Sequence, residues 1–433
     1  MELKDILIAP FFLGIIYLWA YLRKKKQVNP LTKRYYFGAL HLRILGMLAF
    51  ALIYQFYYGG GDTFNFFHDS QIVWQALMDK PDIGLQILTA KAGELNPATQ
   101  SYVNWMYFYV DKNSMVVIRT SAVLGVITYH TYLANAIFFA FYSFTGMWAM
   151  YKAFVDMYPM LYKKLAFAVF AMPSTFFWGS GLMKDSIIVG ALGWSFYAFY
   201  FGILKREFLV KNIVIFIVSL WIMQLVKIYV AMSFLPAAAF WLLLNYRAKV
   251  KTAVLRALLL PLLILFALPI GYVAVSQLTE GTRYSFDEIG ATTKTNTEWN
   301  EISGNAAYSL GEYDGSIGSV ISKFPAAIFV SLFQPFLWQA RNVVMLLAAS
   351  QATFILFLTL QTFFKAGFKF FSLLFKQPFL AFCLVFTLTL AFGTGVGSGN
   401  YGSLDRYRIP FIPFYISMMF IVQYYAKKPK KLV

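Results

Sequence analysis

Long apolar runs are the feature that most restricts the folds open to this chain. Runs of about twenty hydrophobic residues recur along the 433-residue sequence, and a run of that length forms a helix that crosses a bilayer. Hydrophobic residues make up 60% of the chain and charged residues 13%, about half the charged share of a soluble domain. Strands of a membrane barrel would instead alternate in hydrophobicity over shorter stretches. We therefore predict an all-α, polytopic integral membrane protein.

We predict about eleven membrane-spanning helices. They lie near residues 6–22, 36–57, 133–151, 165–178, 186–204, 212–228, 230–245, 255–275, 342–364, 378–396 and 409–425. The stretch 212–245 also fits one tight hairpin. The long connections 58–132 and 276–341 are predicted to lie outside the membrane and to contain interfacial helices. Because no linker or soluble domain separates the spans, residues 1–433 are predicted to form a single membrane domain.

The basic residues are distributed unevenly along these spans. Most of the 37 lysines and arginines fall in every second connection, where Asp156 and Glu207 are the only acids. Such a bias marks the cytoplasmic side. We therefore predict a protein of the inner (cytoplasmic) membrane with its N-terminus outside and its C-terminus in the cytoplasm. The formal charge of +18 then reflects orientation and attraction to anionic membrane lipids, and nucleic-acid binding is disfavoured.

A segment of glycines and acids, residues 59–69, directly follows the second predicted span. Three glycines let the backbone turn sharply near a ligand, and charged groups at the mouth of a span commonly mark a working site. Asp62 and Asp69 are the candidate catalytic carboxylates. With His68 they are also candidate ligands of a divalent metal, the one cofactor that these residues suggest. The alternative is a glycine turn that ends a helix and exposes solvated polar side chains.

The turn at residues 173–186 lies between two predicted spans on the same outer side. Lys184 directly precedes a helix N-terminus, and the free N–H groups there favour anions. A phosphate would therefore be well placed beside Lys184. In the alternative, Asp185 caps the helix and Lys184 only reaches to the membrane interface.

Arg341 lies at the entrance of the ninth predicted span, three residues after Trp338. A guanidinium pairs with phosphate through two parallel hydrogen bonds, so Arg341 is a candidate phosphate ligand. Trp338 taken alone is an ordinary interface anchor.

Arg406 and Arg408 follow a glycine-rich run at residues 393–402 that contains Asn400. Both arginines lie outside, against the inside-positive trend, so we expect each to pair with Asp405 or with a lipid phosphate. The run has no phosphate-loop signature, and helix packing explains its glycines equally well.

Arg43 and Lys227 are charged residues within the predicted spans. Arg43 either reaches the interface or faces the bundle interior, and Lys227 is expected near the outer cavity. His41 and His130 have no clustered partners and are interpreted as structural.

Together these features resemble the membrane-integral glycosyltransferases of the GT-C superfamily. The likeness consists of an acidic segment on the first long external loop, interfacial helices in that loop, about eleven spans and the late Arg406-Tyr407-Arg408-Ile409-Pro410 segment. The spacing of Trp178, Ser180, Lys184 and Asp185, and of Pro335, Phe336 and Trp338, is also similar to motifs of bacterial membrane proteins of this kind.

The resemblance implies a bacterial cell-envelope enzyme of polysaccharide biosynthesis. It would move a sugar from a polyprenyl-phosphate carrier to a glycan, lipid or protein acceptor on the outer face of the membrane. Asp62, or else Asp69, would take the acceptor's proton. The residues that would hold the lipid phosphate, the sugar or the prenyl chain are Lys184, Arg341, Asn400, Arg406, Arg408, Trp178 and Trp338.

Two alternatives stay open. A polymerase or ligase of lipid-linked glycans, of the O-antigen type, would depend on Arg406 and Arg408 more than on Asp62. A non-catalytic transporter of lipid-linked sugars, or a subunit of an envelope complex, would need no catalytic acid at all. The transferase interpretation further predicts that the acids and the cations meet in one pocket at the outer leaflet.

Overall fold

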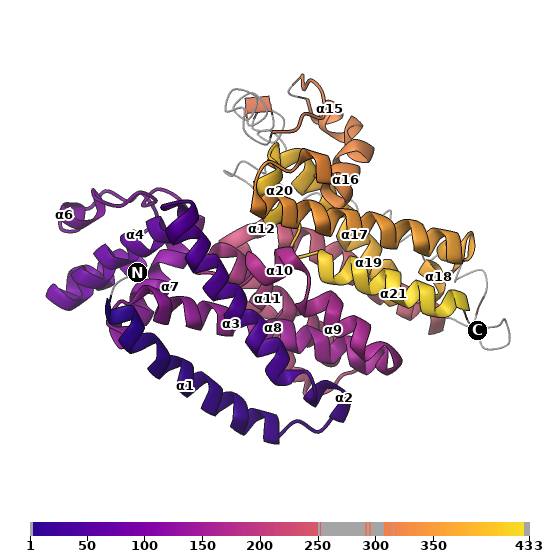
Figure 1. Ribbon diagram of the computed structural model, residues 1–433, viewed down its shortest axis with the longest axis horizontal. Coiled ribbons are helices and arrows are strands. Elements are labelled where there is room, and N and C mark those ends of the chain that lie inside the picture. Colours follow the sequence, from indigo (N-terminus) through magenta and orange to yellow (C-terminus); the bar gives the residue numbers. More distant parts are fainter. Residues whose placement is uncertain are drawn as a thin grey trace. The chain divides into compact units, whose positions relative to one another are not determined.

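The computed structural model describes residues 3–249, 307–314 and 316–427, together with single positions between residues 250 and 306 (Figure 1). Within these ranges every regular element is a helix, and β pairing is limited to one isolated bridge between Ala307 and Asn400. The predicted all-α fold is therefore confirmed for the described part of the chain.

The chain groups into two compact units. The N-terminal unit comprises Met1–Ile228 and the C-terminal unit Tyr229–Val433, and we describe each by itself. Helix α12 (Leu209–Lys249) carries the chain from the first unit into the second. Residues 1–433, predicted as a single domain, thus separate into two packing units.

The N-terminal unit contains the helices that precede α12. They are α1 (Leu3–Lys25), α2 (Pro30–Lys33), α3 (Tyr36–Leu52), η1 (Ile53–Tyr57), α4 (Asp62–Asp79), α5 (Pro81–Thr89), α6 (Gln100–Val103), α7 (Lys112–Thr128), α8 (Tyr132–Met157), η2 (Pro159–Leu161), α9 (Tyr162–Phe170), α10 (Pro173–Phe177), α11 (Lys184–Ala198) and η3 (Phe199–Leu204).

Helix α8 is central to the N-terminal unit and packs against α1, α3, α9 and α11. It approaches α11 closely because glycines face one another across the contact. A Cβ atom on Gly146 would collide with the backbone of Gly190, and one on Gly193 would collide with the backbone of Gly146. Small residues allow such close packing of membrane helices. The start of α8 is tied to α1, since the Leu133 N–H donates to Asp5 at 2.9 Å.

The predicted span at 165–178 consists of the two short helices α9 and α10. With the turn that follows, α10 lies along one face of α3. Gly46 faces the carbonyl of Phe176 so closely that a side chain there would collide with it. The ring of Phe50 packs at 5.2 Å from Phe177 and 5.9 Å from Trp178, measured between ring centres. This packing brings the turn before α11 against the C-terminal half of α3.

The C-terminal unit contains the second segment of α12 and the helices that follow it. They are α15 (Ile317–Ser322), α16 (Phe324–Phe333), η4 (Leu337–Gln339), α17 (Val343–Ala366), α18 (Lys369–Lys376), α19 (Pro378–Ser398), α20 (Tyr401–Tyr407) and α21 (Ile412–Lys427). Helix α19 packs against α16, α18, α20 and α21, and α17 packs against α21.

One glycine of the late glycine-rich run serves helix packing. A Cβ atom on Gly395 would collide with the carbonyl of Ala327, so α16 crosses α19 at this point. The Ser331 hydroxyl, one turn along α16, donates to the carbonyl of Ala391 at 2.7 Å and closes the contact. Gly399 has a positive φ of 60° and ends α19, a conformation that glycine adopts without strain.

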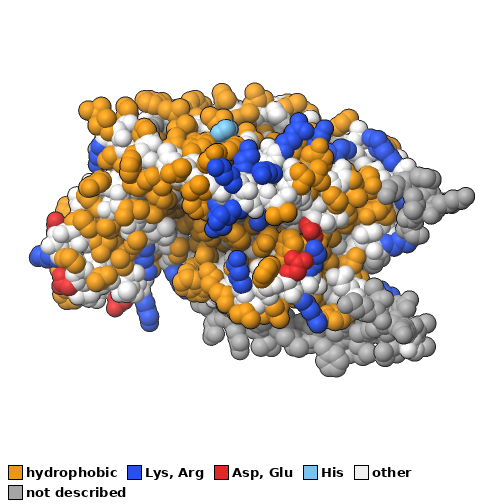
Figure 2. All heavy atoms as spheres, turned by 90° about the horizontal axis from the view of Figure 1, so that it is seen from below, with side chains coloured by type: hydrophobic (Ala, Val, Ile, Leu, Met, Phe, Trp, Pro, Cys, Tyr) orange, Lys and Arg blue, Asp and Glu red, His pale blue; other side chains and the backbone are white. Residues whose placement is uncertain are grey.

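Seven helices among the described residues are long and apolar enough to cross a membrane, or eight if the bent pair α20–α21 counts as one span. Figure 2 accordingly shows hydrophobic side chains over much of one face, with lysines and arginines gathered in groups. The predicted spans 212–228 and 230–245 correspond to the two helical segments of α12, which meet at a break at Lys227. The predicted span 255–275 lies outside the described residues. The count of about eleven is not confirmed.

Candidate functional site

Three consecutive glycines shape the start of α4. Gly59, Gly60 and Gly61 all have positive φ angles, of 66°, 151° and 122°. These conformations strain residues with a side chain, and a Cβ on Gly61 would also press on the ring of Tyr54. The chain therefore turns directly from η1 into α4. Asp62 becomes the first residue of α4, half-buried, at a helix end whose free N–H groups favour a carboxylate.

The first turn of α4 is bound to the turn that precedes α11. The Thr63 hydroxyl donates to the carbonyl of Leu182 at 3.0 Å and lies 2.9 Å from the hydroxyl of Tyr132. The Lys184 ammonium lies 5.7 Å from the ring centre of Phe66. Asp62 and Phe66 are one helical turn apart, so they share a face of α4. The face that carries Asp62 is therefore the face that Lys184 approaches.

Lys184 also pairs with Asp111, a residue that the sequence analysis did not select. The Lys184 ammonium lies 2.9 Å from Oδ2 of Asp111. Asp111 is the N-cap of α7, where its Oδ1 accepts from the Asn113 N–H at 3.0 Å and its Oδ2 from the Ser114 hydroxyl at 2.5 Å. An Asp directly before the first helical residue is a recognisable N-cap signal.

The balance of forces on Asp111 favours its charged form. Partial burial acts to raise the pKa of this carboxyl, but the hydrogen bonds from Ser114 and Lys184 and the charge of Lys184 outweigh it, so the pKa is lowered. Side-chain exposure is 19% for Lys184 and 42% for Asp111, so solvent reaches the pair. We call Asp62, Asp111 and Lys184 the acid–lysine edge.

Asp69 has a different environment from Asp62, although only a short stretch of α4 separates them. Its side chain is fully buried. Its two oxygens accept from the backbone N–H groups of Tyr107 at 3.0 Å and Phe108 at 2.8 Å, and His68 Nδ1 lies 3.1 Å from Oδ1. This carboxylate holds the segment before α7 against α4, a structural role that occupies both of its oxygens.

The metal interpretation gains no support from the geometry. Among the residues that the structure describes, no group of three or more His, Cys, Asp or Glu side chains is arranged to hold a metal ion. His68 and Asp69 are adjacent, but the backbone already occupies Asp69.

Asp185 and Lys227 form a buried ion pair next to the acid–lysine edge. The Lys227 ammonium lies 2.5 Å from Oδ1 of Asp185, and the two side chains are 7% and 2% exposed. Lys227 has non-helical angles, φ −149° and ψ 83°, which break α12 at this residue. The pair therefore links the first turn of α11, which begins at Lys184, to the break in α12.

Trp178 and Arg43 lie in the core of the N-terminal unit. Trp178 is 5% exposed and packs against Phe50 and Phe177, so its ring faces other aromatic rings rather than solvent. Arg43 is 2% exposed and donates to the carbonyl of Thr175 at 2.6 Å and to the hydroxyl of Ser180 at 3.3 Å. Of the two interpretations of Arg43, the one that faced it to the interior agrees with this burial.

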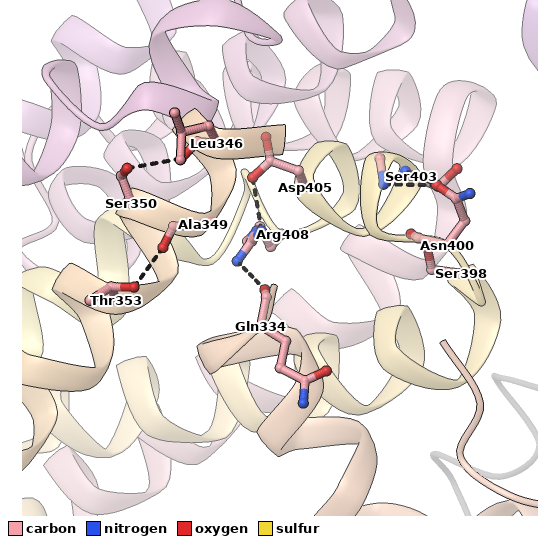
Figure 3. A network of polar contacts seen from close by, with 11 residues as sticks. Gln334, Leu346, Ala349, Ser350, Thr353, Ser398, Asn400, Ser403, Asp405 and Arg408 are labelled. Carbon is pink, nitrogen blue, oxygen red and sulfur yellow. Dashed lines mark hydrogen bonds and ion pairs between the residues drawn. The ribbon is translucent and has the colours of Figure 1, made fainter. Parts of the chain in front are cut away.

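Arg408 is sealed within the C-terminal unit, between Asp405 and Gln334 (Figure 3). Its Nη2 lies 2.9 Å from Oδ1 of Asp405, and its Nη1 donates to the carbonyl of Gln334 at 3.1 Å. The side chains of Arg408 and Asp405 are 0% and 6% exposed. Arg408 therefore pairs with Asp405, one of the two partners that we expected, and ties α20 to the end of α16.

Asn400 also has a structural task. Its side-chain oxygen accepts from the N–H groups of Gly402 at 2.8 Å and Ser403 at 3.4 Å, which caps α20. Tyr308 crosses the end of α19 beside it, since its hydroxyl donates to the carbonyl of Gly395 at 2.7 Å.

The remaining predicted site residues of the C-terminal unit are more exposed to solvent than Arg408. Trp338 is 80% exposed and stacks on Phe336, with ring centres 4.7 Å apart and planes 16° apart. Arg341 is exposed, and Arg406 is half-buried.

The predicted site residues thus divide between the units. Asp62, His68, Asp69, Trp178 and Lys184 belong to the first, and the others to the second. That the two sets share one pocket stays a prediction. Comparison of the chain with models of protein families, with curated proteins and with solved structures gave no match.

Proposed function

We propose that this protein is a membrane-integral glycosyltransferase. It moves a sugar from a polyprenyl-phosphate donor to an acceptor on the outer face of the cytoplasmic membrane. In this proposal about eleven helices span the bilayer, the N-terminus is outside and the C-terminus is cytoplasmic, as the distribution of basic residues predicts. The helices α4, α5 and α7 would lie along the outer interface.

The acid–lysine edge is the observation that supports this function best. Asp62 begins α4, Lys184 begins α11, and the hydrogen bond from Thr63 to Leu182 holds these two helix starts together. A half-buried acid thus begins one helix, on the face that Lys184 approaches, and lies at the junction with the start of a second helix far away in the sequence. Helix N-termini and a lysine together favour a bound phosphate.

The chemistry assigned to these residues is an acid–base displacement. The acceptor hydroxyl oxygen forms a bond to the anomeric carbon as the bond from that carbon to the phosphate oxygen breaks. Asp62 takes the hydroxyl proton, and the electron pair of the broken bond goes to the departing lipid phosphate. Lys184 stabilises the negative charge that grows on that phosphate.

Two residue roles that we predicted from the sequence are withdrawn, those of Asp69 and Trp178. Asp69 was the fallback base, but its oxygens already accept backbone N–H groups, so we assign the base to Asp62 alone. Trp178 is enclosed by aromatic rings, so we no longer assign it to sugar stacking. Trp338 and Arg341 keep their proposed roles in binding, because both are exposed.

The test compares Asp62→Asn with Asp79→Asn in protein reconstituted into vesicles. Asp79 is an exposed acid at the other end of α4 and serves as the matched control. The assay supplies a panel of radiolabelled undecaprenyl-phosphate sugars and follows the release of undecaprenyl phosphate in the presence of envelope extract as acceptor. We expect Asp62→Asn to lower the rate at least about a hundredfold and Asp79→Asn to leave it unchanged.

Thermal unfolding in detergent must accompany this assay. Equal unfolding temperatures for both variants and the wild type would show that loss of rate is chemical. Full activity of Asp62→Asn would remove Asp62 from the mechanism. If the wild type binds undecaprenyl phosphate but transfers none of the panel sugars, a transporter or polymerase becomes the better interpretation.

The polymerase or ligase alternative is not favoured by a specific observation. It depends on Arg406 and Arg408, but Arg408 is wholly buried in an ion pair with Asp405. Its discriminating variant is therefore Arg406→Gln, since loss of Arg408 would disturb the fold as well.

A further inference from the structure

The connection between α17 and α19 folds into the short helix α18. Helix α17 ends at Ala366 and α19 begins at Pro378, and both are long and apolar enough to span a membrane. Helix α18, Lys369–Lys376, is therefore held where two spans end. At the end of a span the surroundings change from acyl chains to lipid head groups.

The inward face of α18 packs against other helices of the C-terminal unit. Phe370, Leu373 and Leu374 are buried, and α18 packs against α17, α19 and α21. The ring of Phe370 also packs at 4.6 Å from that of Phe363. These contacts fix the helix in place, so its opposite face has one orientation.

The outward side carries large aromatic rings. Phe364 at the end of α17 is 86% exposed, Phe368 in the corner is 93% exposed, and Phe371 on α18 is 55% exposed. Three exposed rings within one short corner are costly in water. They fit the boundary between head groups and acyl chains, where amphipathic helices bury such side chains.

The same corner has a positive charge without an internal counter-ion. Residues 363–377 contain Lys365, Lys369 and Lys376 and no acid. All three lysines are exposed, and none is in an ion pair within the described residues. Lysines around an interfacial aromatic cluster attract anionic lipid head groups.

We propose that residues 363–377 form a binding site for anionic phospholipid head groups. The phenylalanines insert at the acyl boundary, and the lysines contact the phosphates of the surrounding lipids. Continuity with two spans favours lipid over a protein partner, because a segment at this depth is surrounded by bilayer. This site is independent of the transferase proposed above.

A single label on α18 tests the position of the helix. Ser372 is exposed on α18, and Cys383, the one cysteine in the sequence, is buried. A spin label is attached to Ser372→Cys in a Cys383→Ala background, and its depth is measured in nanodiscs by collision with oxygen and with a water-soluble nickel chelate. We expect the label at head-group depth. The reference is a label on Ser101→Cys, an exposed position on α6, and equal accessibility of the two labels to nickel would overturn the proposal.

Matched charge variants test the ligand. The first replaces Lys365, Lys369 and Lys376 by Gln, and the second replaces Lys80, Lys91 and Lys112, which are also exposed, in the same way. Affinity for phosphatidylglycerol is measured by lipid exchange in nanodiscs of mixed phosphatidylglycerol and phosphatidylcholine. We expect about a fivefold loss for each lysine removed from the α18 corner. Equal losses in the two variants would show general attraction to the bilayer and contradict a site at α18.

Discussion

The Lys184–Asp111 and Arg408–Asp405 pairs join the same kinds of groups in the two units, but solvent reaches only the first. Their ion-pair distances are equal, 2.9 Å in each. Lys184 and Asp111 are 19% and 42% exposed, whereas Arg408 and Asp405 are 0% and 6% exposed. A bound phosphate can therefore compete for Lys184, while Arg408 is committed to the protein.

Burial decides whether a cation of this protein can bind a ligand or is held by the fold. Arg408 was predicted to lie outside, against the inside-positive trend, and in the structure it is bound by a carboxylate and a backbone carbonyl. Removing one partner of a buried pair leaves the other charge without compensation, which costs far more than opening an exposed pair. Variants of Arg408, Asp69 and Asp111 should therefore differ in how far they destabilise the protein.

Arg408→Met should have the largest effect on stability. It removes the guanidinium beside Asp405 and the hydrogen bond to the carbonyl of Gln334. We expect a loss of about 3–5 kcal/mol in the free energy of unfolding, measured by denaturant titration in detergent. The double variant Arg408→Met/Asp405→Asn should recover part of that loss. If Arg408→Met is as stable as the wild type, the buried pair has no structural role.

Asp69→Asn should have an intermediate effect. The amide keeps one acceptor oxygen, but it cannot accept from both Tyr107 and Phe108 as the carboxylate does. The expected loss is about 1.5–3 kcal/mol, since hydrogen bonds to a charged group are lost. Asp79→Asn on the same helix is the control and should change stability little. Unchanged stability in Asp69→Asn would return Asp69 to the list of candidate catalytic acids.

Asp111→Asn should have the smallest effect, below about 1 kcal/mol, because the pair with Lys184 is partly exposed. The pKa of Asp111 is lowered in the folded state, so its contribution is present above the ordinary carboxyl pKa and is lost as the pH falls through the folded pKa. The difference in unfolding temperature between wild type and variant should therefore shrink below about pH 4. A difference that persists at lower pH would show that the charge of Asp111 is not its cause.

The helix break near Lys227 shows how far sequence reasoning reaches along the chain. The apolar run from 212 to 245 is too long for one simple span, and its single lysine marks the point of interruption. A division there was predicted, as two spans or a hairpin. The structure has a division at this point, since α12 consists of two helical segments that meet at non-helical angles at Lys227, and the Lys227 ammonium forms a buried ion pair with Asp185. The partner of Lys227, Asp185 on α11, is not indicated by any local pattern.

Apolar length and the distribution of basic residues were enough to predict a helical membrane protein, because both follow from the cost of placing polar groups in a bilayer. Local rules also predicted that glycines 59–61 would turn the chain before Asp62. The different environments of Asp62 and Asp69 came only from the tertiary structure. A carboxylate becomes structural when backbone N–H groups from a distant segment reach it, as those of Tyr107 and Phe108 reach Asp69. Such contacts arise from packing between segments that are far apart in the sequence. They therefore cannot be predicted from neighbouring residues.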